Sequence, residues 1–453
     1  MLEKFFHLKE NNTTVKTEVL AGITTFMTMA YILAVNPAML SASGMNATAV
    51  LIATCLASFV GTLAMALMAN YPFALAPGMG LNAYFAYTVC LGMGYDWRVA
   101  LMAVFVEGLI FIVLSLTNVR EAIFNAIPSN LKKGVSAGIG LFIAFIGLQG
   151  AHIVVNNDST LLTYVDFAGN WHTEGICAFL ALIGLVIIVV LHVKGLKGSI
   201  LVGIIATWIL GMICQAAGIY HVDVDNGFNS LYPTLSFTDF SSFGETFGQC
   251  FQADFSNVSI FNFIAIVLAF LFVDMFDTIG TLVGTASRAG MLNDEGNMPK
   301  MKEALLSDAI GTIAGAATGT STITTFVESA TGVAAGGRTG LTALTTGILF
   351  LASIFIAPIA AIIPAPAISA VLIYVGILMI AGLKKIDFDD VYQLIPVALM
   401  LIAIPISGSI GHGIGIGMIS YTVLKVFSGK GKEVSVVTYI ISIIFLIKFF
   451  AVV

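Results

Sequence analysis

The chain has 453 residues, of which 58% are hydrophobic and only 10% are charged. A single water-soluble core cannot hide so much apolar surface, so this composition excludes an ordinary soluble domain and predicts a membrane protein. The formal net charge of −6 gives no indication of nucleic acid as a partner, because charge in a membrane protein is interpreted by its place relative to the spans.

The first segment, 1–18, is polar and contains three lysines. It lacks the basic-then-apolar pattern and small-residue cleavage site of a secretory signal. We therefore expect a retained cytoplasmic tail at 1–18.

Apolar stretches long enough to cross a bilayer, about 20 residues as a helix, recur along the rest of the chain. Alternating strand patterns are absent, so the spans should be helices, which close their own backbone hydrogen bonds in lipid. The expected spans lie near 19–40, 48–69, 73–92, 98–118, 134–153, 175–193, 198–218, 259–285, 304–320, 321–336, 339–362, 367–382, 391–407 and 411–427. They predict an all-α polytopic membrane protein with fourteen transmembrane helices, divided by an extracytoplasmic loop at 219–258.

The basic residues test this count, because Lys and Arg collect on the cytoplasmic side of short loops. With the N-terminus inside, 17 of the 19 basic residues fall in the first segment or in alternate connections. Arg98 and Lys448 fall elsewhere. An apolar run at 434–450 follows the last basic cluster, and the sequence leaves open whether it crosses the bilayer or lies along the interface or the bundle.

Two spans have interrupted helical patterns, and each is the third of its group of seven. The first contains Ala76-Pro77-Gly78-Met79-Gly80, and the second is rich in hydroxyl residues from Gly319 to Ser329. Breaks at matching positions of two halves indicate inverted repeats. We expect a first repeat at 19–218, a second at 259–427, and a C-terminal basic loop with an extra hydrophobic segment at 428–453.

Four acidic residues lie deep in predicted spans: Glu107, Asp274, Asp277 and Glu328. A carboxylate at the bilayer centre costs about 2.5–3.5 kcal/mol on insertion scales, so it usually marks a functional site. Asp277 and Glu328 accompany polar or broken spans and favour function. For Glu107 and Asp274, a structural hydrogen bond by a protonated acid and a functional role both stay open.

Such a site suits a neutral, flat ring with hydrogen-bonding groups along its edge. A carboxylate accepts two N–H bonds side by side, and the Asn82 amide offers both a donor and an acceptor. Burial of a carboxyl group allows proton binding and ligand binding to depend on one another. Phe26, Tyr84 and Phe326 could stack on the ring, although aromatic side chains in membrane helices more often simply pack.

The residues at these breaks resemble the nucleobase:cation symporter family, in its azaguanine-like purine permease branch. The segments that carry the resemblance run nearly end to end: 22–31 (GITTFMTMAY), Asn36-Pro37, 76–84 (APGMGLNAY), 272–282 (FVDMFDTIGTL) and 319–332. Within the branch, 272–277 (FVDMFD) and 336–341 (GGRTGL) resemble adenine permeases more than hypoxanthine and guanine permeases.

The resemblance implies a proton-coupled importer in which a core domain (spans 1–4 and 8–11) moves past a gate domain (spans 5–7 and 12–14), as in an elevator. It implies substrate binding by Asp277, Glu328 and Asn82. Phe326 and Thr281 match positions beside the base in related carriers, which have other residue types there. Proton-coupling candidates are Glu328, Asp277 and Asp274.

Two other readings stay open. One is an anion exchanger of the same fold, although no basic residue lies near either break. The other is an intramembrane aspartyl hydrolase, although Asp274 and Asp277 lie on one helix and do not face each other. We expect no cofactor, no metal and no nucleic-acid partner, and a location in the plasma or inner membrane. The partners would be a purine base, a proton and membrane lipid, and a homodimer stays open.

Overall fold

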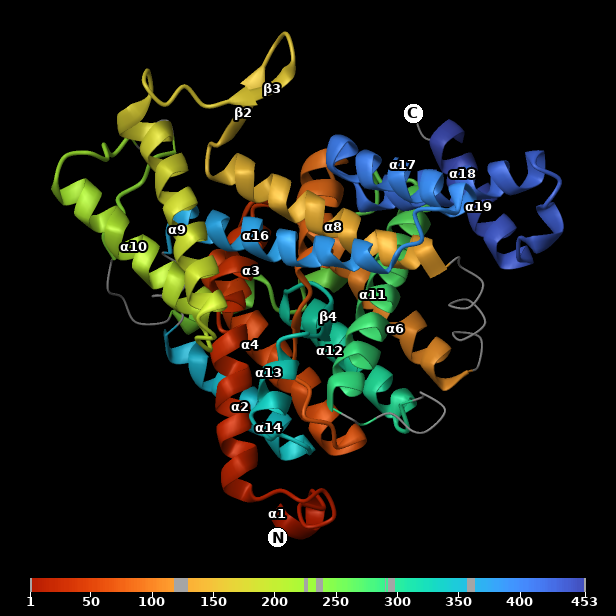
Figure 1. Cartoon of the computed structure of the whole chain (residues 1–453), viewed down its shortest axis with the longest axis horizontal. Helices are drawn as coiled ribbons and strands as arrows, with labels where there is room; N and C mark the ends of the chain where they lie inside the picture. The colour runs from red at the N-terminus through yellow and green to blue at the C-terminus, as the bar shows by residue number, and fades with distance from the viewer. Residues whose placement is uncertain are drawn as a thin grey trace.

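The structure is a computed structural model that describes residues 2–117, 129–223, 227–233, 239–289, 291, 298–356 and 363–451. The chain forms a bundle of helices (Figure 1). The α-helices are α1 (Leu2–Phe5), α2 (Val15–Met29), α3 (Ile32–Ser41), α4 (Ala47–Ala64), α5 (Met79–Ala83), α6 (Trp97–Leu116), α8 (Ser129–Gly150), α9 (Ile176–Val193), α10 (Ser199–Ala216), α11 (Ile260–Ala289), α12 (Met301–Thr318), α13 (Ser329–Ala334), α14 (Gly340–Ala352), α16 (Ala365–Ile380), α17 (Val391–Ser407), α18 (Ile410–Phe427) and α19 (Val436–Ala451).

Shorter elements extend or join these helices. The π-helical and 3-10 segments are η1 (Met65–Ala69), η2 (Tyr84–Gly92), η3 (Trp171–Gly175), η5 (Phe240–Glu245), η6 (Gln249–Gln252), η7 (Ser353–Ile356), η8 (Ala381–Lys385) and η9 (Gly431–Glu433). The strands are β1 (Leu75–Pro77), β2 (Val154–Asn157), β3 (Leu161–Tyr164) and β4 (Ile323–Thr325).

Within the described residues, seven helical stretches are long and apolar enough to cross a membrane. They are α2 with α3, α4 with η1, α6, η3 with α9, α10, α11 and α18. Shorter apolar helices occur in α8, α14, α16, α17 and α19. The molecule is therefore a multi-pass helical membrane protein, while the count of fourteen spans stays a prediction.

The expected first span is interrupted. Helix α2 ends at Met29 and α3 begins at Ile32, so Ala30 and Tyr31 form a turn within an otherwise continuous apolar stretch. The sequence showed no proline or glycine at this point, since Pro37 lies further on, inside α3. The hydrogen bond from the Tyr31 hydroxyl to Glu328 places this point of the chain beside the second broken span.

The first residues are docked on the bundle rather than free of it. Phe6 and Leu8 are each only 2% exposed and pack in a cluster with Ala66, Leu341 and Ala343. The segment 1–18 therefore contains structure that packs on helix ends, and α2 begins within it.

The β2–β3 hairpin, which the sequence analysis did not predict, projects from the opposite end of the molecule in Figure 1.

Two sets of helices pack mainly among themselves. One set contains α2, α4, α6, α11, α12 and α14, and the other contains α8, α9, α10, α16, α17 and α18. Helix α19 packs along α18. Close packing of α4 against α12 depends on paired glycines: a Cβ on Gly311 would lie 3.1 Å from the Gly61 Cα. Small residues let membrane helices approach closely in this way.

Candidate functional site

The two interrupted spans meet inside the first set of helices. Strands β1 and β4 pair in antiparallel orientation, with Ala76 opposite Thr324. Flanking backbone bonds extend the pairing, from the Gly78 N–H to the Thr322 carbonyl at 3.0 Å and from the Phe326 N–H to the Ala74 carbonyl at 3.0 Å. Lipid offers no partner for open backbone groups, so two broken helices at membrane depth are stabilised by bonding to each other.

Threonine side chains from neighbouring helices complete this arrangement. The Thr62 hydroxyl on α4 accepts from the Leu75 N–H at 2.9 Å and contacts the Leu75 carbonyl at 3.1 Å. The Thr312 hydroxyl on α12 donates to the Ile323 carbonyl at 3.0 Å. In each half of the chain, a threonine on the helix before the strand thus hydrogen-bonds that strand. These bonds help to fix the register of the β1–β4 pair, which we call the crossing.

Glu328 and Asp277 come together at this crossing. Glu328 lies between β4 and α13, and its Oε1 accepts a hydrogen bond of 2.7 Å from the Tyr31 hydroxyl. Asp277, on α11, lies close enough to interact electrostatically with both Glu328 and Tyr31. Both carboxyl residues are half-buried, whereas the Tyr31 side chain is buried. Both residues therefore keep some accessible surface at a place surrounded by helices.

Asn82 and Ser321 form a second polar contact across the same crossing. The Ser321 hydroxyl donates to the Asn82 Oδ1. The Asn82 side chain is fully buried, and its Nδ2 has no hydrogen-bond partner among the described residues. The amide therefore retains an unused donor near the end of α5, although the pairing with Ser321 was not anticipated.

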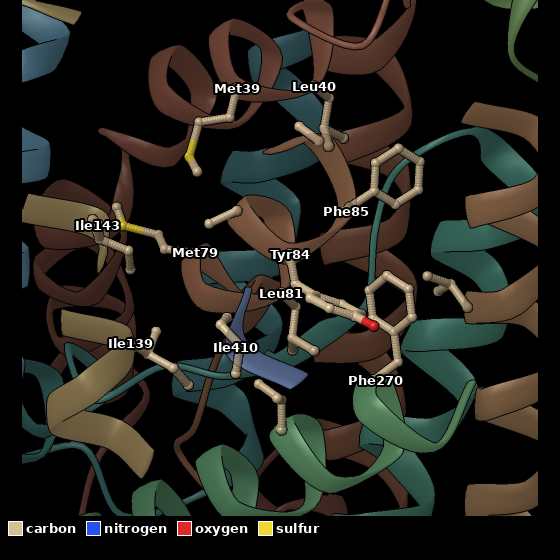
Figure 2. Packing of buried hydrophobic residues seen from close by; sticks show 14 of the residues in the cluster. Met39, Leu40, Met79, Leu81, Tyr84, Phe85, Ile139, Ile143, Phe270 and Ile410 are labelled. Carbon is tan, nitrogen blue, oxygen red and sulfur yellow. The ribbon is translucent and has the colours of Figure 1, made fainter. Parts of the chain in front are cut away.

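The three aromatic candidates have different surroundings. Phe326 follows β4 directly and is 7% exposed. Tyr84 is fully buried and packs edge-to-face on Phe270, with ring centroids 4.8 Å apart. Figure 2 shows Tyr84 and Leu81 among apolar side chains that include Phe270 and Ile410. The surroundings of Tyr84 favour the packing alternative over a face open to a ligand.

Phe26 and Thr281 complete the predicted set. Phe26 is half-buried on α2 and packs edge-to-face on Phe350 of α14, with ring centroids 5.3 Å apart. Thr281 lies on α11, about one turn after Asp277, and is 6% exposed. No direct contact joins either residue to Glu328 among the described interactions.

Asp274 points to a different place from Asp277. Its Oδ1 contacts the Thr278 hydroxyl at 3.0 Å, and its carboxyl group lies close enough to interact electrostatically with Glu107 on α6. The same Thr278 hydroxyl reaches Asp308 on α12 at 2.6 Å. Asp274, Glu107 and Asp308 are all fully buried, so they form a dry group behind the half-buried carboxyl groups.

Sequence reasoning missed Tyr31 and Asp308. Tyr31 closes the 22–31 motif, but its hydrogen-bond partner, Glu328, lies 297 residues away in the sequence. Asp308 lies only a few residues inside the expected span 304–320, where a carboxylate could still have reached the membrane surface. The acid-rich pattern of α11 was a usable signal, because buried acids in one helix require partners on its neighbours.

The fold is that of a membrane transporter. The transmembrane domain of a cyanobacterium bicarbonate transporter aligns with 87% of this chain and 97% of that domain, with a TM-score of 0.61 and 16% sequence identity. At that identity the likeness concerns the fold alone.

The chain belongs to the permease family, whose model matches residues 16–417. The guanine/hypoxanthine permease PbuO of Bacillus subtilis is 43% identical over 98% of this chain and 99% of its own length. The adenine permease AdeP of Escherichia coli is 38% identical over 99% of this chain and 96% of its own length. The chain is accordingly a transporter and not an enzyme, which removes the aspartyl hydrolase reading.

Proposed function

We propose that this permease imports a purine base, adenine or hypoxanthine/guanine, together with a proton. The relatives named above are permeases for adenine and for guanine/hypoxanthine, and their similarity covers nearly the whole chain. Both base types are planar, with N–H donors and ring-nitrogen acceptors along their edges. We also propose that the protein lies in the cell membrane and that its N-terminus is on the cytoplasmic side.

The observation that carries the proposal is the group formed by Glu328, Asp277 and Tyr31 between the two broken spans. Its two half-buried carboxyl groups supply acceptors for the N–H edge of a base, and each can accept bonds side by side. The Tyr31 hydroxyl holds Glu328 by a 2.7 Å bond, which orients one carboxyl oxygen and leaves the other for a ligand. Asn82 Nδ2, on α5 after strand β1, is a further donor.

A neutral base suits this group better than an anion does. Asp277 and Glu328 would both repel a negatively charged cargo. Arg338, which follows α13, is occupied elsewhere, since its guanidinium donates to the Val333 carbonyl at 2.8 Å and the Gly337 carbonyl at 2.7 Å. The bicarbonate transporter shares the fold at 16% identity, so the anion-exchange alternative has support only from architecture.

The division of the helices into two sets supports an elevator movement. We assign the set with α2, α4, α6, α11, α12 and α14 to the core and the set with α8, α9, α10, α16, α17 and α18 to the gate, in two inverted repeats of seven helices. The antiparallel β1–β4 pair joins the two halves within the core. Core meets gate at Gly80, where an added Cβ would lie 2.5 Å from Ile139 Cγ2 of α8 (Figure 2 labels Ile139 together with Met79 and Leu81, the neighbours of Gly80).

The proposal is tested by uptake of labelled bases into proteoliposomes. We expect Glu328→Gln and Asp277→Asn each to abolish purine uptake while membrane insertion stays intact, because each removes an acceptor that the base requires. Glu245→Gln, an exposed acid in η5, is the matched control. Uptake within about twofold of wild type in both variants would remove the site assignment.

Two further measurements separate the alternatives. A competition panel of unlabelled purines, pyrimidines and small anions identifies the cargo class, and an anion that competes better than any purine would favour the exchanger. Collapse of the pH gradient should abolish accumulation above equilibrium. Unchanged accumulation would refute proton symport while leaving the purine assignment standing.

A further inference from the structure

Glu328 is attached to a helix that is too short to hold its position by itself. Helix α13 has six residues and begins directly after Glu328. Isolated helices shorter than about 12–15 residues are marginal, because the first hydrogen-bonded turn fixes several residues for a single bond. The position of Glu328 therefore depends on the elements against which α13 packs, mainly α2 and α11.

One face of α2 follows α13 along its length. Four residues spaced three or four apart lie on this face, which we call the α2 face: Glu18, Ala21, Thr25 and Thr28. Their contacts on the other segment lie at 338–339, 337, 332 and 331, in that order. The two segments therefore lie antiparallel. Tyr31, two residues after the end of α2, bonds Glu328, which directly precedes α13.

Glycine at position 332 allows α13 to lie directly on α2. A Cβ on Gly332 would collide with the Thr25 hydroxyl and would lie 2.9 Å from the Ala21 carbonyl oxygen. Gly337 is similarly close, since its Cβ would lie 3.0 Å from that of Ala21. Small residues let membrane helices approach in this way, and the contact leaves α13 little room to shift toward α2.

The C-terminal end of α13 is fixed by hydrogen bonds. The fully buried Glu18 accepts from the Arg338 N–H at 2.9 Å and from the Thr339 N–H at 3.2 Å. The Arg338 guanidinium in turn donates to the Val333 carbonyl, in the last turn of α13, at 2.8 Å. This end of α13 is therefore tied to the first turn of α2.

Thr28 and Thr331 join the two helices at the end near Glu328. Their hydroxyl oxygens lie 3.0 Å apart, and the Thr331 hydroxyl donates to the Glu328 carbonyl at 2.7 Å. A hydroxyl group has one hydrogen to donate. Because that of Thr331 is used on the Glu328 carbonyl, the Thr28 hydrogen makes the contact between the two threonines. A chain of bonds then runs from α2 to the backbone of Glu328.

We infer that the α2 face positions Glu328 for the base, and that Thr28 and Thr331 are positioning residues for purine binding. The inference rests on the proposed function, in which Glu328 accepts hydrogen bonds from the base. The backbone of Glu328 is held through Thr331, and its carboxyl group is held by Tyr31. Without the Thr28 hydroxyl, α13 is free to shift along α2, and the Glu328 carboxyl group spends less time where the base needs it.

A purely structural contact would give a different kinetic result. If the bond between Thr28 and Thr331 only stabilised the fold, its loss would lower the number of active transporters and hence the maximal rate. The KM of the remaining transporters would not change. If the bond positions Glu328, the KM for the purine rises while the maximal rate is kept.

The test measures KM and maximal rate for uptake of labelled adenine and guanine by proteoliposomes that contain Thr28→Val. The substitution keeps the branched shape of the side chain and removes its hydroxyl. We expect KM to rise about three- to tenfold, which corresponds to the net contribution of one hydrogen bond. The maximal rate should stay within about twofold of wild type. A wild-type KM, or a fall in maximal rate alone, would overturn the inference.

Two variants on the same helix are the controls. Thr24→Val removes a hydroxyl that donates to the Leu20 carbonyl of α2 itself at 2.9 Å, so its KM should stay within about twofold of wild type. Thr28→Ser retains the hydroxyl and should keep the wild-type KM. A raised KM in Thr28→Ser, or an equal rise in Thr24→Val, would assign the effect to packing and contradict the inference.

A double variant tests whether the two threonines act through each other. Thr331→Val loses its bonds to Thr28 and to the Glu328 carbonyl, so it should raise KM at least as much as Thr28→Val. Adding Thr28→Val to it should raise KM no further, because the shared bond is already absent. Additive increases would show that the two hydroxyls act separately, against the inference.

A second measurement does not depend on the cargo. Amide hydrogen exchange of the segment 329–337 should be faster in Thr28→Val than in wild type and in Thr24→Val. Unchanged exchange with an unchanged KM would refute the role of the α2 face and leave the purine assignment standing. Failure of the wild-type protein to take up any purine would instead refute the proposed function, and with it this role in base binding.

Discussion

Replacement of Tyr31 by Phe tests whether one hydrogen bond positions the carboxyl group of Glu328, which we propose binds the purine. The variant keeps the buried ring and removes only the hydroxyl that donates to Glu328 Oε1 at 2.7 Å. Glu328 would remain half-buried with a free oxygen that can rotate away from the base. The loss should therefore appear in transport more than in stability.

The size of the effect follows from the type of bond. A hydrogen bond to a charged group contributes about 1.5–3 kcal/mol. Each 1.36 kcal/mol is tenfold in rate, so Tyr31→Phe should lower kcat/KM for purine uptake about 10- to 150-fold. Initial rates of labelled adenine and guanine uptake into proteoliposomes measure it directly.

A matched variant controls for the loss of a tyrosine hydroxyl. Tyr439, on α19, donates to the Gly431 carbonyl at 3.0 Å, far along the chain from the crossing. Tyr439→Phe should leave uptake within about twofold of wild type. If Tyr31→Phe also stays within that range, the hydroxyl does not orient Glu328 and the reasoning for this site is wrong.

Two further predictions concern stability. Glu18 is fully buried and accepts from the Arg338 N–H at 2.9 Å, the Thr339 N–H at 3.2 Å and the Thr342 hydroxyl at 2.6 Å. Glu18→Ala strands these donors at about 1–3 kcal/mol each, so the melting midpoint in detergent should fall by several degrees, and an unchanged midpoint would contradict this role. Gly311→Leu should lower the melting midpoint more than the control Gly244→Leu. A Cβ on Gly311 would lie 2.8 Å from Ile323 Cγ2, whereas Gly244 has open space around it. Equal effects of the two substitutions would show that α4 and α12 can separate freely.

The sequence was sufficient for the class of protein and its family. Apolar stretches in lipid must form helices, so hydropathy alone indicated a multi-pass membrane protein. The motifs at 76–84 and 272–282 indicated the permease family, because each motif is a short pattern that can be recognised locally along the chain. The order and approximate bounds of the apolar spans were also accessible, as α4, α6, α10 and α17 show.

Only the tertiary structure decided which polar residues meet. Tyr31 and Glu328 are separated by 297 residues, and Asn82 and Ser321 by 239. Nothing in either local pattern specifies these partners, because the pairs form when two broken helices share backbone hydrogen bonds across the β1–β4 crossing. Asp274 and Asp277 are three residues apart in the sequence but have different neighbours. Asp274 lies near the buried Glu107, and Asp277 lies near the half-buried Glu328. The helices and strands packed against α11 determine what surrounds each of its faces.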